Sequence, residues 1–145
     1  MSIHDNKTQA RRLYEEVFGR GNFAAADEIL APDCISHGPG VPPTTGTGGI
    51  KAQAERLRTS FPDLRTILND QLAEDDRVAS RWTGTGTFSN RLEVPGMPPL
   101  EPSGQTITWD EIRIDRFANG RIVESWFIPD RMGLFQQLGL FRAPR

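Results

Sequence analysis

Apolar residues recur every three or four positions through the first 61 residues, which is the period of an α-helix. This pattern predicts three amphipathic helices, at 10–18, 22–30 and 47–61. Asn22 and Thr47 can cap the second and third helices, and a proline at position 32 stops the second. Residues 34–36 form a short strand candidate. The segment 37–49 holds three prolines and five glycines and is predicted to be a loop.

After Pro62 the period changes from helical spacing to alternation. Residues 64–72 read as a half-buried strand, and residues 77–88 as a second strand with Trp82 and alternating threonines. On the first strand, one face is expected to carry Leu64, Thr66, Leu68, Asp70 and Leu72. The following segment, 89–104, has four prolines and two glycines and is predicted to be a long excursion, with room for a short strand at 91–94.

The strongest turn signal is Asn119-Gly120, which joins strands predicted at 105–117 and 121–128 into a hairpin. A three-residue loop, which we favour, pairs Arg113 with Ser125 and Glu111 with Phe127; a two-residue loop would put Arg113 opposite Trp126. One face is then expected to carry Trp109, Glu111, Arg113, Asp115, Val123, Ser125 and Phe127. The other is expected to carry Ile112, Ile114, Arg116, Ile122, Glu124, Trp126 and Ile128.

A last helix is predicted to open at Pro129-Asp130 and to stop at Gly139. Helices early and antiparallel strands late predict an α+β domain whose sheet is covered on one face. The length of 145 residues fits one domain, 1–145, with an ordered core at about 8–140.

Composition narrows the classes of function. The net charge is −2 and the 17 Lys and Arg residues are scattered, so we expect no nucleic-acid partner. No apolar run reaches the roughly 20 residues needed to cross a bilayer, and residues 1–10 are too polar for a signal peptide. The single cysteine, Cys34, is expected in the core without a disulfide, which suits the cytoplasm. Two histidines and one cysteine predict no metal site, and no cofactor motif is present.

Several short stretches together resemble the SnoaL-like polyketide cyclases of the nuclear-transport-factor-2-like superfamily. In chain order they are YEEVF at 14–18, RGN at 20–22, LAPD at 30–33, FPDL at 61–64, DRVA at 76–79, RWT at 81–83, GMPP at 96–99, NGRIVESW at 119–126 and QQLG at 136–139. The resemblance implies a cone with one pocket between the helices and a curved, mostly antiparallel sheet. It also implies a homodimer packed through the sheet. Activities in the family range from aldol ring closure to isomerisation, hydration and plain ligand binding, so the fold alone does not define the function.

The cyclases that the chain resembles hold a catalytic Asp, a nearby His and an amide side chain on the pocket face of this hairpin. Aligned on the Asn119-Gly120 turn, these positions are Phe127, Arg113 and Glu111. Phe127 cannot accept a proton, so the aldol mechanism of the family does not carry over residue by residue.

Glu111, Arg113 and Asp115 alternate on one strand and form the best candidate catalytic set. Such a set could position a water molecule with a carboxylate that Arg113 keeps ionised. This loosely resembles the limonene epoxide hydrolase branch of the fold, although there the second carboxylate lies on a neighbouring strand. The alternative is a charge ladder that faces solvent or a second subunit.

The remaining candidates each have a functional and a structural interpretation. His37 could be a general acid or base near the pocket mouth, or a loop residue without a role. Trp82 and Trp126 could wall a pocket for a flat apolar ligand, or simply pack the core. Trp109, Ser125 and Phe127 are predicted to contact the ligand from the same face of the hairpin.

Two function classes follow. One is a cofactor-independent acid–base enzyme, of the isomerase, cyclase or hydrolase type, acting on a small and mostly apolar carbonyl, ester or epoxide compound. The other is a non-catalytic binder of a small apolar or aromatic molecule, or a dimeric scaffold. Residues of the charged set that point into a cavity would favour catalysis.

Overall fold

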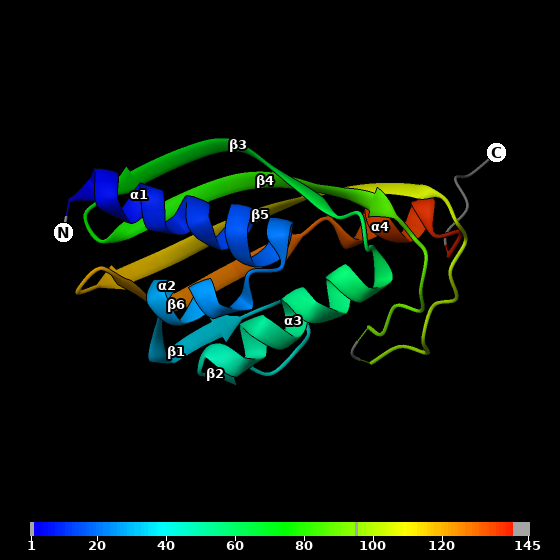
Figure 1. Ribbon diagram of the computed structural model, residues 1–145, viewed down its shortest axis with the longest axis horizontal. Helices are drawn as coiled ribbons and strands as arrows, with labels where there is room; N and C mark the ends of the chain where they lie inside the picture. The colour runs from blue at the N-terminus through cyan, green and yellow to red at the C-terminus, as the bar shows by residue number, and fades with distance from the viewer. Residues whose placement is uncertain (1, 95, 141–145) are drawn as a thin grey trace.

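One curved, six-stranded sheet carries the helices on a single face (Figure 1). The computed structural model describes residues 2–94 and 96–140, so the outermost ends of the predicted domain lie outside the described residues. The helices are α1 (Ile3–Arg12), the π-helix η1 (Leu13–Phe18), the 3₁₀ helix η2 (Phe23–Ala25), α2 (Ala26–Ile29), α3 (Thr47–Ser60) and α4 (Arg131–Gln137). The strands are β1 (Leu30–His37), β2 (Thr44–Thr45), β3 (Arg65–Glu74), β4 (Arg77–Thr87), β5 (Thr106–Ala118) and β6 (Arg121–Pro129).

The strand order is β2-β1-β6-β5-β4-β3, and β1 next to β6 is the one parallel pair among the named strands. The predicted α+β class with a mostly antiparallel sheet is therefore confirmed. Two details differ. The strand predicted at 34–36 begins at Leu30, directly after α2, and the predicted loop contains the short strand β2. The segment 89–104 is an excursion, as expected, with a single bridge between Leu92 and Leu100.

A bulge in β3 overturns part of the predicted alternation. The pairing with β4 shifts between Leu68 and Asp70, so the side chains after Leu68 change faces. Leu72, expected with Leu68 on the inner face, is 75% exposed, and Gln71 and Ala73 are the less exposed residues instead. The prediction that Asp70 and Leu72 share a face with Leu68 is wrong for this reason.

The hairpin of β5 and β6 has a two-residue turn, so the favoured three-residue register is wrong. Asn119 and Gly120 both have positive φ, 52° and 77°, the backbone that a type I′ turn requires. The pairing then shifts between Arg116 and Phe117, and this bulge restores the inward facing of Ser125 and Phe127. Arg113 therefore lies opposite Phe127, not opposite Ser125 or Trp126.

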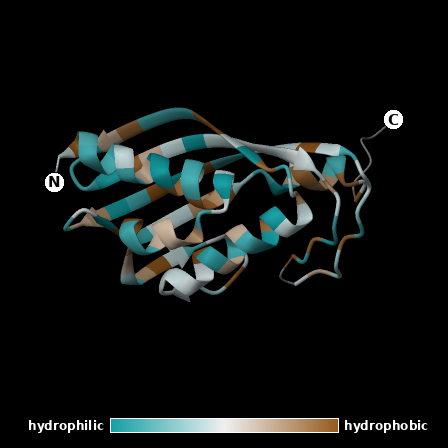
Figure 2. Cartoon of the chain, in the orientation of Figure 1, coloured by the Kyte–Doolittle hydropathy of each residue, from teal (hydrophilic) through white to brown (hydrophobic). Residues whose placement is uncertain are grey.

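The residues predicted for each face of the hairpin lie on that face in the structure, with one exception. The inner face of β5 carries the buried residues Ile107, Trp109, Glu111, Arg113, Asp115 and Phe117. Ile122, expected on the outer face, is fully buried because it lies on the turn side of the bulge. Figure 2 shows hydrophilic and hydrophobic residues alternating along the strands, as this two-sided arrangement demands.

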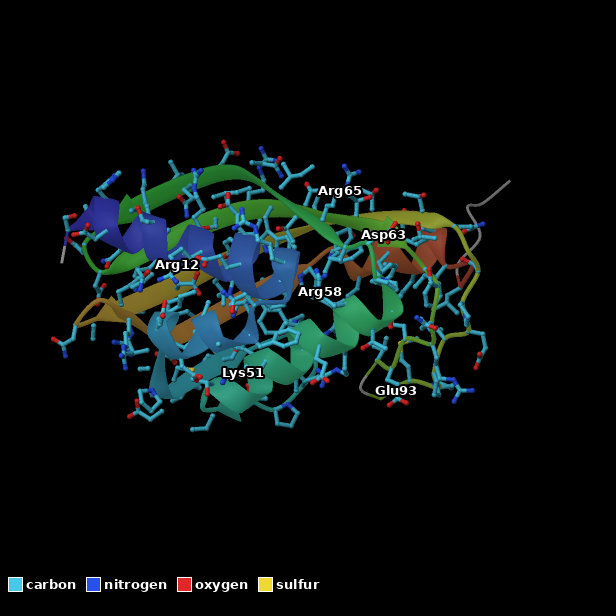
Figure 3. The ribbon with its side chains drawn as sticks, viewed as in Figure 1. Arg12, Lys51, Arg58, Asp63, Arg65 and Glu93 are labelled. Atoms are coloured by element: carbon cyan, nitrogen blue, oxygen red, sulfur yellow. The ribbon has the colours of Figure 1, made fainter. Side chains whose placement is uncertain are left out.

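The core has two parts. One surrounds the N-terminal helices and includes Leu13, Val17 and Ile29; the other lies beyond the end of α3 and includes Phe61 and Trp109. Arg58 of α3 ties the helices together, because its Nη1 donates to the carbonyls of Phe18 and Gly19 at 3.0 and 2.9 Å. Figure 3 shows this side chain between η1 and α3. Among the described residues, no helix is long and apolar enough to cross a membrane.

Candidate functional site

A pocket of about 130 Å³ opens between α3, the 89–104 excursion, the β5–β6 hairpin and α4. A cavity of about 150 Å³ can hold a benzene molecule, so this space suits a small ring. Apolar side chains form most of the wall: Leu57, Phe61, Leu92, Val94, Trp109, Phe127, Pro129, Leu134 and Phe135. The polar and charged residues that line it are Gln53, Arg56, Glu93, Glu111 and Arg131.

Because α3 and β5 run in opposite directions (Figure 1), the end of α3 lies near the start of β5. At the apolar end, Phe61 of α3 lies against Trp109 of β5, with ring centroids 5.1 Å apart. Toward the polar end, α3 presents Gln53 and β5 presents Glu111. Gln53 and Phe61 are eight residues apart, or about 12 Å along a helix. The lining contributed by α3 changes from polar to apolar over this length.

Glu111 is the carboxyl group that lines the pocket from inside the sheet. It is only 5% exposed, and burial raises its pKa from 4.5 to about 7, against the opposing effect of Arg113. Its Oε1 lies 3.9 Å from Arg113 Nη1 and, among the described residues, accepts no hydrogen bond. A carboxyl in this state can take up or release a proton near neutral pH.

Arg113 and Asp115 lie deeper, next to Glu111 on the inner face of β5. Arg113 Nε donates to Asp115 Oδ1 at 3.2 Å, and Ser125 Oγ donates to the same oxygen at 2.5 Å. Burial raises the pKa of Asp115, and Arg113 and Ser125 oppose that rise. The Arg113 and Asp115 side chains are fully buried, so the alternative of a solvent-facing or subunit-facing ladder is wrong.

The two terminal nitrogens of Arg113 are buried and have no hydrogen-bond partner among the described residues. The ring of Phe127 lies over the guanidinium, with its centroid 5.3 Å from Cζ. Phe127 itself lines the pocket, whereas Arg113 does not. The aromatic ring therefore separates the charged interior from the ligand space. Gly38 permits this position, because a Cβ there would overlap the Phe127 ring.

Trp82 lies in the core and not in the pocket wall. It is fully buried and stacks on Tyr14, with centroids 5.3 Å apart, and it contacts Phe18 at 5.9 Å. The structural interpretation of Trp82 is therefore the one that the geometry supports. Burial and the charge of Asp115 raise the pKa of the Tyr14 hydroxyl well above its ordinary value, so that group stays protonated.

His37 and Trp126 lie on the outer face of the sheet, away from the pocket. Because β1 runs parallel to β6, His37 pairs with Trp126 and their rings stack at 5.4 Å. His37 Nε2 also lies 2.7 Å from Glu124 Oε2, and Arg77 lies over the Trp126 ring at 5.3 Å. The acid–base role expected for His37 and the ligand contact expected for Trp126 are corrected on these grounds.

The structure thus brings Trp109, Glu111 and Phe127 into the lining and places Arg113, Asp115 and Ser125 behind it. Sequence reasoning missed the contributions of α3, the excursion and α4. Figure 3 shows Glu93 on the excursion, whose apolar neighbours at 92 and 94 were the available signal for a pocket wall. Within residues 2–94 and 96–140, no group of three or more His, Cys, Asp or Glu side chains could hold a metal ion.

Comparisons with known proteins agree with this fold. Three solved structures are similar over nearly their full length. IdmH, a candidate polyketide cyclase from Streptomyces antibioticus, is 30% identical, with 92% of this chain and 98% of that chain covered and a TM-score of 0.75. A candidate polyketide cyclase from Acidithiobacillus ferrooxidans is 30% identical, with 97% and 99% covered and a TM-score of 0.77. AclR, a candidate hydroxylase from Streptomyces galilaeus, is 25% identical, with 97% and 100% covered and a TM-score of 0.82.

A search among curated proteins found no match to this chain. The family model described as SnoaL-like polyketide cyclase matches residues 8–138, which is most of the sequence. The helices and strands that line the pocket, α3, β5, β6 and α4, all lie within that match. The chain belongs to the SnoaL-like polyketide cyclase family.

Proposed function

We propose that this protein is a cofactor-independent acid–base enzyme that moves a proton on a small, mostly apolar carbonyl, ester or epoxide compound. The observation that carries the proposal is Glu111, a pocket-lining carboxyl whose pKa is raised to about 7. A general base works best when its pKa lies near the operating pH, and groups of this kind contribute about 10²- to 10⁴-fold in rate. Most of the rest of the lining is apolar, which matches a mostly apolar substrate.

Glu111 is the catalytic residue in this proposal, and Arg113 is a positioning residue. Because Arg113 Nη1 is 3.9 Å from Glu111 Oε1, the guanidinium opposes the effect of burial and keeps the ionised form of Glu111 accessible near neutral pH. Asp115 and Ser125 hold Arg113 in place from the opposite side. The aldol route of the resembled cyclases does not apply, because Phe127 stands where their base would be.

The test follows solvent deuterium into a panel of small enolisable ketones, together with turnover of small esters and epoxides. We expect activity that rises through about pH 7 as Glu111 ionises, and a loss of at least 100-fold in Glu111→Gln. Glu93→Gln is the matched control, since it removes a carboxylate from the exposed rim of the same pocket. Activity that survives Glu111→Gln unchanged would rule out this role.

Phe127 supports a second candidate, a non-catalytic binder. Its ring shields the Arg113 guanidinium from the pocket, so a ligand meets mainly apolar surface. This candidate predicts measurable binding of small aromatic molecules without turnover, and the same binding in Glu111→Gln as in the wild type.

We also infer that the protein forms a homodimer through the outer face of its sheet. Ile112 and Ile128 lie opposite each other there and are 54% and 69% exposed, and the next pair on the same face is Ile114 with Trp126. A contiguous apolar surface of this kind is typical of an interface.

A further inference from the structure

We propose that the pocket selects ligands with a carboxylate, and that Arg131 and Arg56 bind it at the polar end. This inference rests on the proposed function of the pocket as a ligand site, and it names the class of ligand. The apolar end would hold a small ring or alkyl group, so the ligand is an amphipathic organic acid.

Arg131 is the stronger of the two determinants. It is the first residue of α4, it lines the pocket, and its side chain is fixed by a 2.9 Å hydrogen bond from Nη1 to the carbonyl of Pro39. Its charge also opposes the rise in the pKa of Glu111, which lines the same pocket. Among the described residues, no carboxylate lies within ion-pair distance (4.0 Å) of Arg131.

Arg56 lines the same pocket from α3, one turn after Gln53. It too forms no ion pair with a carboxylate in the described part of the chain. By contrast, both arginines of α1 have acidic partners: Arg11 pairs with Glu15, and Arg12 reaches both Glu16 and Glu28. Two arginines that line one mostly apolar pocket without an ion pair of their own are suitable to bind an anion, because guanidinium groups bind carboxylates through paired hydrogen bonds.

The other charges nearby do not cancel this pair. Glu111 is the one carboxyl at the floor, and burial favours its neutral form. Glu93 also lines the pocket, from the exposed excursion, and offsets one of the two positive charges. The lining thus carries a net positive charge whenever Glu111 is protonated. A neutral ester or amide would form no charge-assisted hydrogen bond with either guanidinium group, which is the physical basis of the selectivity.

The experiment measures binding of 3-phenylpropanoate and of 3-phenylpropanamide by isothermal titration calorimetry. The two probes share a ring and a chain length and differ in charge. We expect the wild type to bind the acid at least tenfold more tightly than the amide. Arg131→Gln and Arg56→Gln should each weaken binding of the acid, Arg131→Gln by about tenfold, and leave binding of the amide unchanged.

Arg121→Gln is the charge-matched control, because Arg121 is exposed at the hairpin turn, far from the pocket along the strand. It should leave the binding of both probes unchanged. Equal affinity for acid and amide in the wild type, or a preference that survives both arginine substitutions, would overturn the proposal, and so would binding of neither probe. Glu111→Gln should keep the preference for the acid, so the catalytic role of Glu111 is judged separately.

Discussion

Replacing Glu111 with Gln should change how the stability of the protein depends on pH. The substitution keeps the size of the side chain and removes its titration. In the folded protein the pKa of Glu111 is about 7, whereas 4.5 is its ordinary value and applies to the unfolded chain.

The sign of the effect follows from which state loses its proton first. Below pH 4.5 the carboxyl is protonated in both states, so it contributes nothing that depends on pH. Between pH 4.5 and about 7 the unfolded chain ionises while the folded chain does not, and the free energy of unfolding falls as the pH rises. At about 1.4 kcal/mol per pKa unit, the fall attributable to Glu111 is about 3 kcal/mol, on the order of a quarter or more of the stability of a typical domain.

The assay is urea denaturation of the wild type and Glu111→Gln at intervals from pH 4 to pH 8, followed by fluorescence. The difference in the free energy of unfolding between the two proteins should shift by about 3 kcal/mol in favour of Glu111→Gln as the pH rises through this range. Subtracting the two curves removes the contribution of the carboxyls that do not act on Glu111. Glu93→Gln should follow the wild-type curve throughout.

A difference that is flat across this range would refute the reasoning, because it would mean that the folded protein does not disfavour the ionised carboxyl. A difference that changes in the opposite direction would mean that Arg113 outweighs burial. Glu111 would then be too weak a base to serve the proposed mechanism at neutral pH.

Three further predictions concern the surroundings of this carboxyl. Arg113→Met should lower the free energy of unfolding at pH 7 by roughly 3–5 kcal/mol, because it leaves the Asp115 carboxylate buried without its counter-ion, and acid pH should restore part of the loss in denaturation curves. Phe127→Ala should enlarge the pocket and shift preference in calorimetry from phenyl toward naphthyl ligands; an unchanged preference would show that the ring does not limit the pocket. The wild type should sediment as a dimer and Ile112→Asp as a monomer, and a monomeric wild type would disprove the interface.

The sequence predicted the fold and the inner face of β5 because both depend on local periodicity. Alternation over thirteen residues places Glu111, Arg113 and Asp115 together on one face, and no tertiary contact is needed to infer it. The bulges in β3 and β6 were not predictable in the same way. A bulge shifts the pairing by one residue, and the hydrogen bonds of the neighbouring strand determine where it falls.

The misplacement of His37 has a different physical origin. The face on which it lies depends on its parallel pairing with β6, a contact between residues 89 positions apart along the chain. Nothing in residues 30–37 alone reports that pairing. The same holds for Arg131 and Arg56, which line one pocket although they lie on α4 and α3, far apart along the chain. The positions of the site residues that periodicity did not predict therefore depend on long-range contacts.

The buried charged residues Glu111, Arg113 and Asp115 lower the stability of this fold, and that cost bears on what the pocket does. Burying ionised groups is unfavourable unless each one is paired and hydrogen-bonded, and apolar residues of similar size are often equal or better. Here Asp115 is paired, but the terminal nitrogens of Arg113 and the Oε1 of Glu111 are buried without hydrogen-bond partners among the described residues. Packing alone would not retain such a set behind an apolar wall. A pocket that needs a carboxyl with a pKa near neutrality would retain it, because burial raises that pKa and Arg113 limits the rise.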